Sequence, residues 1–435
     1  MSLVGDKFSS ILSRLDSSQS GDINVSRRHR PDYKIVLYMG LLMLIGLIII
    51  YAIGPQRANV LNNSYGSEYN DSYFFIKQTI SLAVALLAFA VLASFPYKLL
   101  ISNASRLLLI GLIACAILAV AGWTNLGIAQ ASLGAVRWFD LGPLGSLQPA
   151  EILKFGLVIF TAGFVGIKAM KGKINDLNET LIPVAIVTAI SLFFVVVIQK
   201  DLGTGIAMSS IVASILAVGG LNKKIGMVVL VIGLVAGALF IVSEPHRIDR
   251  VVTFLKGDNT SISDAGSYHI EHAKIAIGTG GLLGVGIGNS VQATGYLPEA
   301  INDSVFAIMG ETFGFIGLVS ILGLFMALLI RILKVMDHLT DMRLKLIVAG
   351  VFGWFGAHVI LNVASMIGIF PLTGITLPLL SFGGTSMIFI SAALGLVFQL
   401  SSYTVHPSRL KEVQYEDSSS RRGIRRSRHT SRSSY

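Results

Sequence analysis

The sequence predicts an all-α polytopic membrane protein with about ten transmembrane helices, and three observations support that fold class. Hydrophobic residues make up 53% of its 435 positions and charged residues only 13%, about half the share found in soluble domains. The mean hydropathy is +0.73. The apolar segments are about 20 residues long, which suits helices rather than the roughly 10-residue strands of a membrane barrel. This composition argues against a disordered chain, a disulfide scaffold and a soluble enzyme with one modest core.

The first apolar segment, Ile35–Ile53, follows a polar and basic N-terminal segment of residues 1–34. No short apolar stretch with a small-residue cleavage site precedes it, so we expect no cleaved signal peptide. The segments 179–198 and 202–220 are separated by a short polar break. Because about 40 residues exceed one span of roughly 20, we expect two spans joined by a tight turn. The remaining spans are expected at 74–95, 106–122, 151–168, 224–243, 304–332, 345–367 and 380–403.

The positions of the basic residues predict the orientation of these spans. Ten spans place both termini on one side of the membrane, and most of the 34 Lys and Arg residues lie on that side. By the positive-inside rule, we expect both termini in the cytoplasm. They precede and follow, along the sequence, a membrane domain of residues 35–405. The Ser- and Arg-rich tail 406–435 is expected to be disordered and held near anionic membrane lipid, with no nucleic acid as partner.

The longest extracytoplasmic loop, residues 244–303, connects the seventh and eighth spans. Connectors of this length are usually functional or disordered, and the glycine-rich apolar stretches of this one favour an ordered, functional loop. Its glycines do not follow the GxGxxG spacing and no strand precedes them, so a dinucleotide fold is not indicated. His269 and His272 have no further ligands nearby, so we expect no zinc site. The glycines are expected to permit tight backbone turns at the membrane face.

Inserting an ionisable residue at membrane depth costs a free energy of about 2.5–3.5 kcal/mol on insertion scales, so each such residue is a candidate site residue. Glu151 and Lys154 lie at positions i and i+3 at the start of the fourth span and therefore share a helix face. They predict either a local ion pair, with Glu151 also favoured by the helix dipole, or the wall of a polar cavity in which Lys154 meets an anion.

Three further residues have both a structural and a functional interpretation, and both stay open from the sequence. Arg137, beside Trp138, is either an interfacial anchor or a bidentate phosphate ligand. Asp201 is either the N-cap of the sixth span or a group that orients a substrate. Asp303 is either the N-cap of the eighth span or a carboxylate at the mouth of an outward-facing cavity, where it would suit general-base catalysis.

The run 370–386, between the last two spans, contains two prolines and three glycines. Irregular backbone at membrane depth is tolerated where it is buried in protein or lines a cavity. This run is therefore either a packed re-entrant turn or part of a site.

Taken together, these motifs resemble the SEDS family (shape, elongation, division, sporulation) of ten-span peptidoglycan glycosyltransferases. The most specific are Gly-Tyr-Leu-Pro-Glu-Ala…Asp at 295–303 and, within 371–386, Pro-Leu-Thr-Gly-Ile-Thr-Leu-Pro and Ser-Phe-Gly-Gly-Thr-Ser. Gln-Pro-Ala-Glu…Lys at 148–154 and Asp-Leu-Gly-Thr at 201–204 add to them. The Leu-Pro-Glu-Ala form of the first motif and the long basic tail are similar to the division branch of the family.

The resemblance implies an enzyme of the bacterial cell membrane that polymerises lipid II. Its role would be cell-wall synthesis at the division septum. Asp303 matches the essential aspartate of the family and would act as the base on the acceptor 4-hydroxyl. That oxygen would attack the lipid-linked donor with inversion and release polyprenyl pyrophosphate, giving a β-1,4 glycan. Arg137 and Lys154 match basic positions suited to the pyrophosphate. The other substrate-binding candidates are Glu151, Asp201, Tyr268, Glu299, Ser381, Gly383 and Thr385.

The same resemblance implies protein partners: a class B penicillin-binding protein, which is a transpeptidase, and other division proteins. No cofactor and no metal ligand set is indicated, since no DxD pair marks a site. Whether a divalent cation, Mg or Mn, binds near the pyrophosphate is left open by the sequence.

Several positions depart from the family pattern. Ile301 and Asn302 stand where His and Thr are frequent, and His269 and His272 stand where Gln is usual. A second Arg is common at position 136, where this chain has Val. Phosphate binding is then expected either to be weaker or to use Arg247, Arg250 or Lys274.

Other functions stay open. A flippase for lipid II or another amphiphile would also use the buried Glu151 and Lys154, but it needs no base at Asp303. A non-enzymatic scaffold for division proteins would rest on the basic tail. Within the polymerase class, a role in elongation is the alternative to a role in division.

Overall fold

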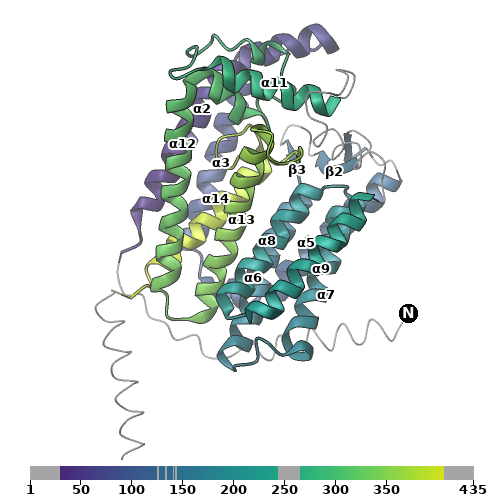
Figure 1. The fold of residues 1–435 in the computed structure, drawn as a ribbon, viewed down its shortest axis with the longest axis vertical. Coiled ribbons are helices and arrows are strands. Elements are labelled where there is room, and N and C mark those ends of the chain that lie inside the picture. Colours follow the sequence, from purple (N-terminus) through teal and green to yellow (C-terminus); the bar gives the residue numbers. More distant parts are fainter. Residues whose placement is uncertain are drawn as a thin grey trace, which may run out of the picture.

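The computed structural model is a bundle of long helices that carries irregular loops, one short helix and a small sheet at one end (Figure 1). It describes residues 30–124, 127–132, 135–140, 142, 145–242 and 265–405. Within those ranges, nine helices are long and apolar enough to cross a membrane. The predicted multi-pass helical fold is therefore confirmed.

The nine helices follow the predicted order along the chain. They are α2 (Tyr33–Tyr65), α3 (Tyr73–Ser94), α5 (Ala104–Trp123), α6 (Pro149–Met170), a helix made of η2 (Leu177–Leu181), α7 (Ile182–Leu192) and η3 (Phe193–Ile198), α8 (Leu202–Gly219), α12 (Val305–His338), α13 (Met342–Met366) and α14 (Gly384–Ser401).

A further long helix, α9 (Lys223–Val242), has 20 residues of almost uninterrupted apolar sequence and occupies the place of the predicted seventh span. Of the loop expected at 244–303, residues 243–264 lie outside the described ranges. The rest contains α11 (Ala265–Thr279) and the short 3-10 helix η5 (Gln292–Thr294). The described part of this loop is thus ordered, as its composition predicts. One more short helix, α4 (Tyr97–Ser102), lies between α3 and α5.

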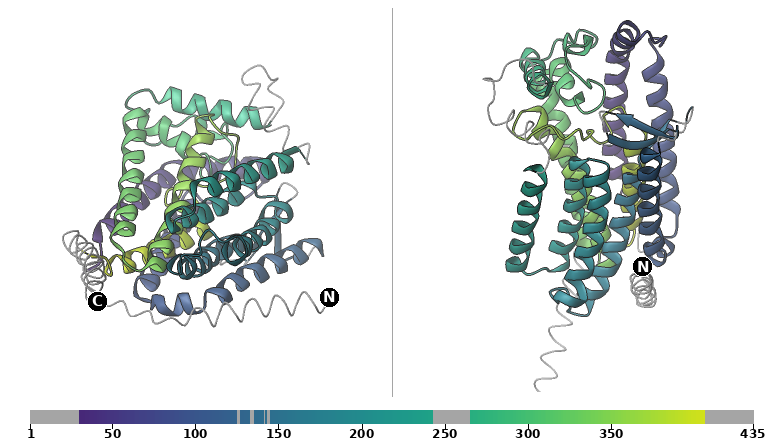
Figure 2. Two further views of the ribbon diagram at one scale, coloured as in Figure 1. Left: turned by 60° about the horizontal axis from the view of Figure 1, so that its bottom comes forward. Right: turned by 90° about the vertical axis from the view of Figure 1, so that its right-hand side faces the viewer.

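The segment expected as a plain loop at 123–150 contains a small antiparallel sheet, which the sequence pattern does not reveal. Its strands are β1 (Ala129–Ser132), β2 (Ala135–Asp140) and β3 (Ser146–Leu147), in the order β1-β2-β3. Phe139 of β2 stands opposite Ala129 on one side and Leu147 on the other. The sheet lies toward the same end of the bundle as α11 (Figure 2, right). The membrane unit itself is all-α.

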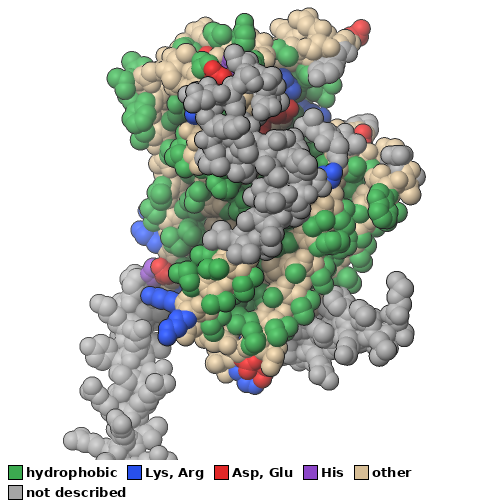
Figure 3. Space-filling view, turned by 45° about the vertical axis from the view of Figure 1, so that its right-hand side comes forward, with side chains coloured by type: hydrophobic (Ala, Val, Ile, Leu, Met, Phe, Trp, Pro, Cys, Tyr) green, Lys and Arg blue, Asp and Glu red, His purple; other side chains and the backbone are tan. Residues whose placement is uncertain are grey.

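The most enclosed helices are α6, α13 and α14, whose most apolar windows are 94%, 78% and 72% buried. α6 packs against α5, α8 and α13, and α14 packs against α3. Outer helices such as α3 and α12 are much less enclosed, since only 22% and 28% of their most apolar windows are buried. Hydrophobic side chains accordingly cover much of the described lateral surface in Figure 3, as expected of helices that face lipid.

The two ends of the described membrane unit lie on the same face of the bundle. The backbone N–H of Asp32, the N-cap of α2, donates to Ser401 Oγ at the end of α14, at 2.8 Å. Asp32 also pairs with Arg331 near the end of α12. With α9 included as the tenth span, the even number of spans requires this arrangement. The cytoplasmic location of this face stays a prediction from the charge bias.

The loop after α11 docks onto a kink in α12 at Gly314, whose φ of 65° and ψ of −169° are not helical. Gly284, with φ 82°, approaches so closely that an added Cβ would lie 2.2 Å from the carbonyl oxygen of Thr312. Backbone hydrogen bonds from Val285 N to Glu311 O and from Phe315 N to Gly281 O, both 2.9 Å, close the contact. The loop glycines therefore do permit tight turns, and they fix the first turns of α12.

Candidate active site

Asp303 occupies the turn directly before α12, at the end of the bundle that carries α11. Of its two interpretations, the one that makes Asp303 the N-cap of the eighth span does not match the structure, because Ser304 holds the N-cap position. Asp303 is partly exposed as a residue, and its Oδ1 atom is buried. Helix capping therefore does not explain why an aspartate stands at position 303, and the general-base interpretation is left.

An amide on α13 holds the backbone of this turn. Asn362 is buried, and its Nδ2 donates to Asp303 O at 2.7 Å and to Ile375 O at 2.8 Å. Phe382 N donates to Ile301 O at 2.7 Å. These bonds join the 295–303 motif to the 371–386 motif, two sequence signals that lie far apart along the chain.

α11 supports the same turn from the other side. His269 Nε2 lies 2.6 Å from Ser304 Oγ, and that hydroxyl donates to Pro298 O at 2.8 Å. Glu299, with φ 49°, accepts backbone hydrogen bonds from Asn302 N and Ser304 N at its carbonyl oxygen. Its half-exposed carboxylate contacts the Asn302 side chain and lies 4.0 Å from Arg57 Nη2. Glu299 thus shapes the turn that presents Asp303.

The expected ion pair on α6 is present and fully enclosed. Lys154 Nζ lies 2.8 Å from Glu151 Oε1, and the two side chains are 0% and 2% exposed. The ammonium also lies 3.2 Å from His358 Nε2 and 5.1 Å from the centre of the Trp354 ring. Within the described residues, Glu151 Oε2 is buried without a hydrogen-bond partner. An ionic group with unused hydrogen-bonding capacity at this depth is typical of a functional site.

One face of α13 connects this pair to the Asp303 turn. Trp354, His358 and Asn362 are spaced four residues apart and so form a single stripe, with about 6 Å of axial rise between neighbours. Trp354 and His358 contact Lys154, and Asn362 holds the Asp303 carbonyl. We call these three residues the α13 stripe. Their spacing within the predicted ninth span indicates that they share a helix face, but it does not indicate what that face contacts.

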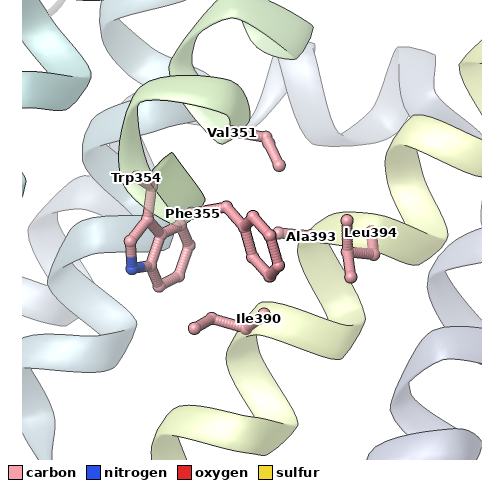
Figure 4. Close-up of a pocket in the computed structure, with 6 residues that line it drawn as sticks. All are labelled: Val351, Trp354, Phe355, Ile390, Ala393 and Leu394. Carbon is pink, nitrogen blue, oxygen red and sulfur yellow. The ribbon is translucent and has the colours of Figure 1, made fainter. Parts of the chain in front are cut away.

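The close-up in Figure 4 shows where α13 faces α14, a contact that shares Trp354 with the α13 stripe. Val351, Trp354 and Phe355 of α13 face Ile390, Ala393 and Leu394 of α14. The side chains leave no room for a water molecule between them, and none of them carries an acid or a base. This contact is helix packing rather than a candidate site.

Arg137 and Asp201 meet at the turn between η3 and α8. Arg137 donates from Nε to Gln199 O at 3.1 Å and from Nη2 to Lys200 O at 2.7 Å, which supports the positive φ of 52° at Lys200. Arg137 therefore braces a turn, a role that neither sequence interpretation includes. Asp201 is the N-cap of α8, which was one of its two interpretations, and its carboxylate accepts hydrogen bonds from Thr204 N and Thr204 Oγ1 at 2.9 Å each.

A bridge runs from this turn to α6, because Gln148 Nε2 donates to Asp201 Oδ2 at 3.3 Å. Gln148 is the N-cap of α6, one turn before Glu151. The ends of α6 and α8 are therefore held together by the polar residues of two predicted motifs.

The remaining candidates lie around the same end of the bundle. Tyr268 on α11 packs its ring 4.1 Å from the His272 ring, and His272 Nδ1 lies 2.7 Å from Gln292 Oε1. Lys274, also on α11, packs against Gly368. The alternative phosphate ligands Arg247 and Arg250 lie outside the described residues, and the described ranges contain no group of three or more His, Cys, Asp or Glu suited to a metal ion.

The 371–386 segment is a packed, irregular turn. Ser381 Oγ accepts from Leu377 N at 2.8 Å, and Gly383 is the N-cap of α14. Thr385 Oγ1 donates to Ser146 O of β3 at 2.9 Å, which ties α14 to the small sheet. The prediction of a packed re-entrant turn is consistent with these contacts, and its irregular backbone borders the Asp303 turn.

Comparison with known proteins agrees with the resemblance seen in the sequence. The family of cell cycle proteins that includes FtsW, RodA and SpoVE matches residues 33–406. The chain belongs to this family. Among FtsW/RodA/SpoVE relatives, the probable peptidoglycan glycosyltransferase FtsW of Nitrosomonas europaea is 32% identical, over 85% of this chain and 93% of its own length. The stage V sporulation protein E of Bacillus subtilis is 30% identical, over 87% of this chain and 99% of its own.

Solved structures of the FtsW/RodA/SpoVE family share the fold. A chain from a peptidoglycan synthase complex, in a study of how polymerization and crosslinking are coordinated, is 25% identical with a TM-score of 0.65, and the match covers 85% of this chain and 97% of that one. The rod shape determining protein RodA of Thermus thermophilus is 25% identical with a TM-score of 0.61, over 86% and 98% of the two chains. The chain is therefore a multi-pass membrane protein that spans nearly the whole length of these relatives.

Proposed function

We propose that the chain is a peptidoglycan glycosyltransferase that polymerises lipid II, with Asp303 as general base. The observation that carries the proposal is the convergence at one end of the bundle. Asp303, a partly exposed residue outside the N-cap position, lies at the end of the α13 stripe that holds its backbone carbonyl, and the other end of the stripe contacts the buried Lys154. The family match and the glycosyltransferase relatives support the reaction class.

In this mechanism, Asp303 takes the proton of the acceptor 4-hydroxyl as its oxygen attacks the anomeric carbon of the donor. The bond from that carbon to the pyrophosphate oxygen breaks, and polyprenyl pyrophosphate leaves with inversion. A general base supplies only about 10²- to 10⁴-fold. Positioning of two membrane-held substrates must supply much of the remainder.

The leaving pyrophosphate needs cations as its negative charge develops. Lys154 is the buried candidate, and the unpartnered Oε2 of Glu151 beside it can accept a hydrogen bond from substrate. Arg137 retains Nη1, which forms no hydrogen bond within the described part of the chain, although its other groups brace the 199–200 turn. Tyr268, Ser381, Gly383 and Thr385 would contribute by shaping the surrounding walls.

The proposal includes partners and a place of action. A class B penicillin-binding protein would cross-link the strands that this chain makes, and other division proteins would bring the pair to the septum. The solved relative in a peptidoglycan synthase complex supports a synthase partner. The relatives that carry the name FtsW support division rather than elongation.

The experiment is a comparison of polymerisation with lipid translocation. The purified chain, with its candidate penicillin-binding partner blocked by a β-lactam, is supplied with labelled lipid II in liposomes. Glycan strands that lysozyme digests are the expected product. Translocation of labelled lipid II without strand formation would instead make the chain a transporter, because flipping requires no hydroxyl deprotonation.

A further inference from the structure

A basic pocket of about 470 Å³ lies at the opposite end of the bundle from Asp303, between the ends of α2, α12 and α14. Its lining includes the basic residues Arg30, Lys34, Arg331 and Lys334, together with Asp32 and His338. We call it the basic pocket. Lys334 lies 20 positions after the kink at Gly314, which places the pocket about 30 Å farther along α12 than that kink. The basic pocket is therefore separate from the candidate active site.

The lining of the basic pocket is net positive, with four Lys and Arg side chains against one carboxylate. That carboxylate is already used, because Asp32 pairs with Arg331 and accepts from Lys34 N at 3.1 Å. His338 directs Nδ1 to Lys334 O. The side chains of Lys34 and Lys334 are exposed. Arg and Lys groups arranged in this way suit a phosphate-bearing ligand.

The surroundings of the pocket indicate that the ligand is a lipid. On α2, Lys34 is followed on the same helix face by Leu37 and Leu41, which are 56% and 39% exposed. On α12, Lys334 is preceded at four-residue spacing by Ile330 and Met326, which are 43% and 57% exposed. Two outward-facing apolar stripes thus run from the rim of the pocket along the bundle. Acyl chains would lie along the stripes while the headgroup occupies the pocket.

We propose that the basic pocket binds the phosphate headgroup of an anionic phospholipid. The face that carries the pocket is the one that the charge bias predicts to be cytoplasmic, where anionic lipids attract basic residues. A bound headgroup would bridge the cytoplasmic ends of α2 and α12, which otherwise connect here through the Asp32–Arg331 pair. A soluble phosphate compound has the same headgroup chemistry but gains nothing from the apolar stripes.

The test compares two double variants of the full chain in zwitterionic nanodiscs doped with phosphatidylglycerol. Lys34→Gln with Lys334→Gln removes two pocket cations, and Lys98→Gln with Lys223→Gln removes two exposed cations elsewhere on the same face. Retained lipid is measured by native mass spectrometry. At about a fivefold loss per basic contact, the pocket variant should bind phosphatidylglycerol about 25-fold more weakly, and the control variant should match the wild type.

Three results would overturn the proposal. Equal losses in both variants would mean that only the overall charge attracts lipid. Equal retention of phosphatidylcholine and phosphatidylglycerol by the wild type would exclude headgroup recognition. Binding of soluble glycerol phosphate as tightly as phosphatidylglycerol would make the pocket a site for soluble phosphates. An unchanged thermal midpoint of the pocket variant in zwitterionic lipid shows that it remains folded.

Discussion

Replacing Lys154 with Met tests the buried ion pair and its proposed contact with the leaving group together. Met keeps most of the side-chain volume and removes the charge. Glu151 is then left with no cation in an enclosed site, since its side chain is only 2% exposed. Breaking a buried pair in this way typically costs about 3–5 kcal/mol, because one charge remains without its partner. Loss of the contact with the Trp354 ring adds to that cost.

The double variant Glu151→Gln with Lys154→Met separates stability from activity. It removes both charges, and replacing a whole buried pair by neutral groups is often neutral or stabilising. We therefore expect its free energy of unfolding to return to within about 1 kcal/mol of the wild type. Its polymerase activity should stay at least about 10²-fold below wild type, because the developing pyrophosphate charge still lacks its cation.

The assay is an unfolding titration in mixed micelles, followed by Trp fluorescence, beside a lipid II polymerisation assay on the same preparations. A stable and fully active double variant would refute the role of Lys154 at the leaving group. A single variant as stable as the wild type would refute the buried pair itself.

Three other changes have directions that the structure determines. Asn362→Ala leaves two carbonyls without their donor, including that of Asp303. Turnover should fall about 10-fold or more, because each 1.4 kcal/mol added to the activation free energy slows the reaction about tenfold. Membrane insertion, measured by protease protection, should be unchanged. Gly284→Ala places a Cβ 2.2 Å from Thr312 O at a φ of 82°, so it should lower the thermal midpoint far more than Gly278→Ala, where a Cβ meets nothing. Burial raises the pKa of Tyr97 to about 12, so the unfolded chain ionises first. Stability should be constant below about pH 9 and fall as pH rises between about 10 and 12, and a Tyr97→Phe variant should lack that part of the decline.

The membrane plan was accessible from the sequence because it depends on local properties. Apolar length determines the spans, and Asp201 followed by Gly and Thr predicts a helix start that the structure confirms. The pair Glu151–Lys154 follows from helix periodicity alone. These features need no knowledge of which helices become neighbours.

The features that the sequence did not reveal depend on contacts between distant segments. Arg137 binds the carbonyls of the 199–200 turn, more than 60 residues away, which no spacing rule signals. His358 and Asn362 become site residues only because α13 packs between α6 and the Asp303 turn. The small sheet forms across short, weakly patterned segments, in which tertiary context outweighs intrinsic strand preference.

The most direct test of the central claim is the initial rate of lipid II polymerisation by Asp303→Asn, compared with a Glu271→Gln control. Glu271 is an exposed carboxylate on α11 at the same end of the bundle. Loss of the base predicts a fall of about 10²- to 10⁴-fold for Asp303→Asn and wild-type activity for the control, with both proteins folded and inserted. Polymerisation by Asp303→Asn at the wild-type rate would contradict the assignment of Asp303 as the general base.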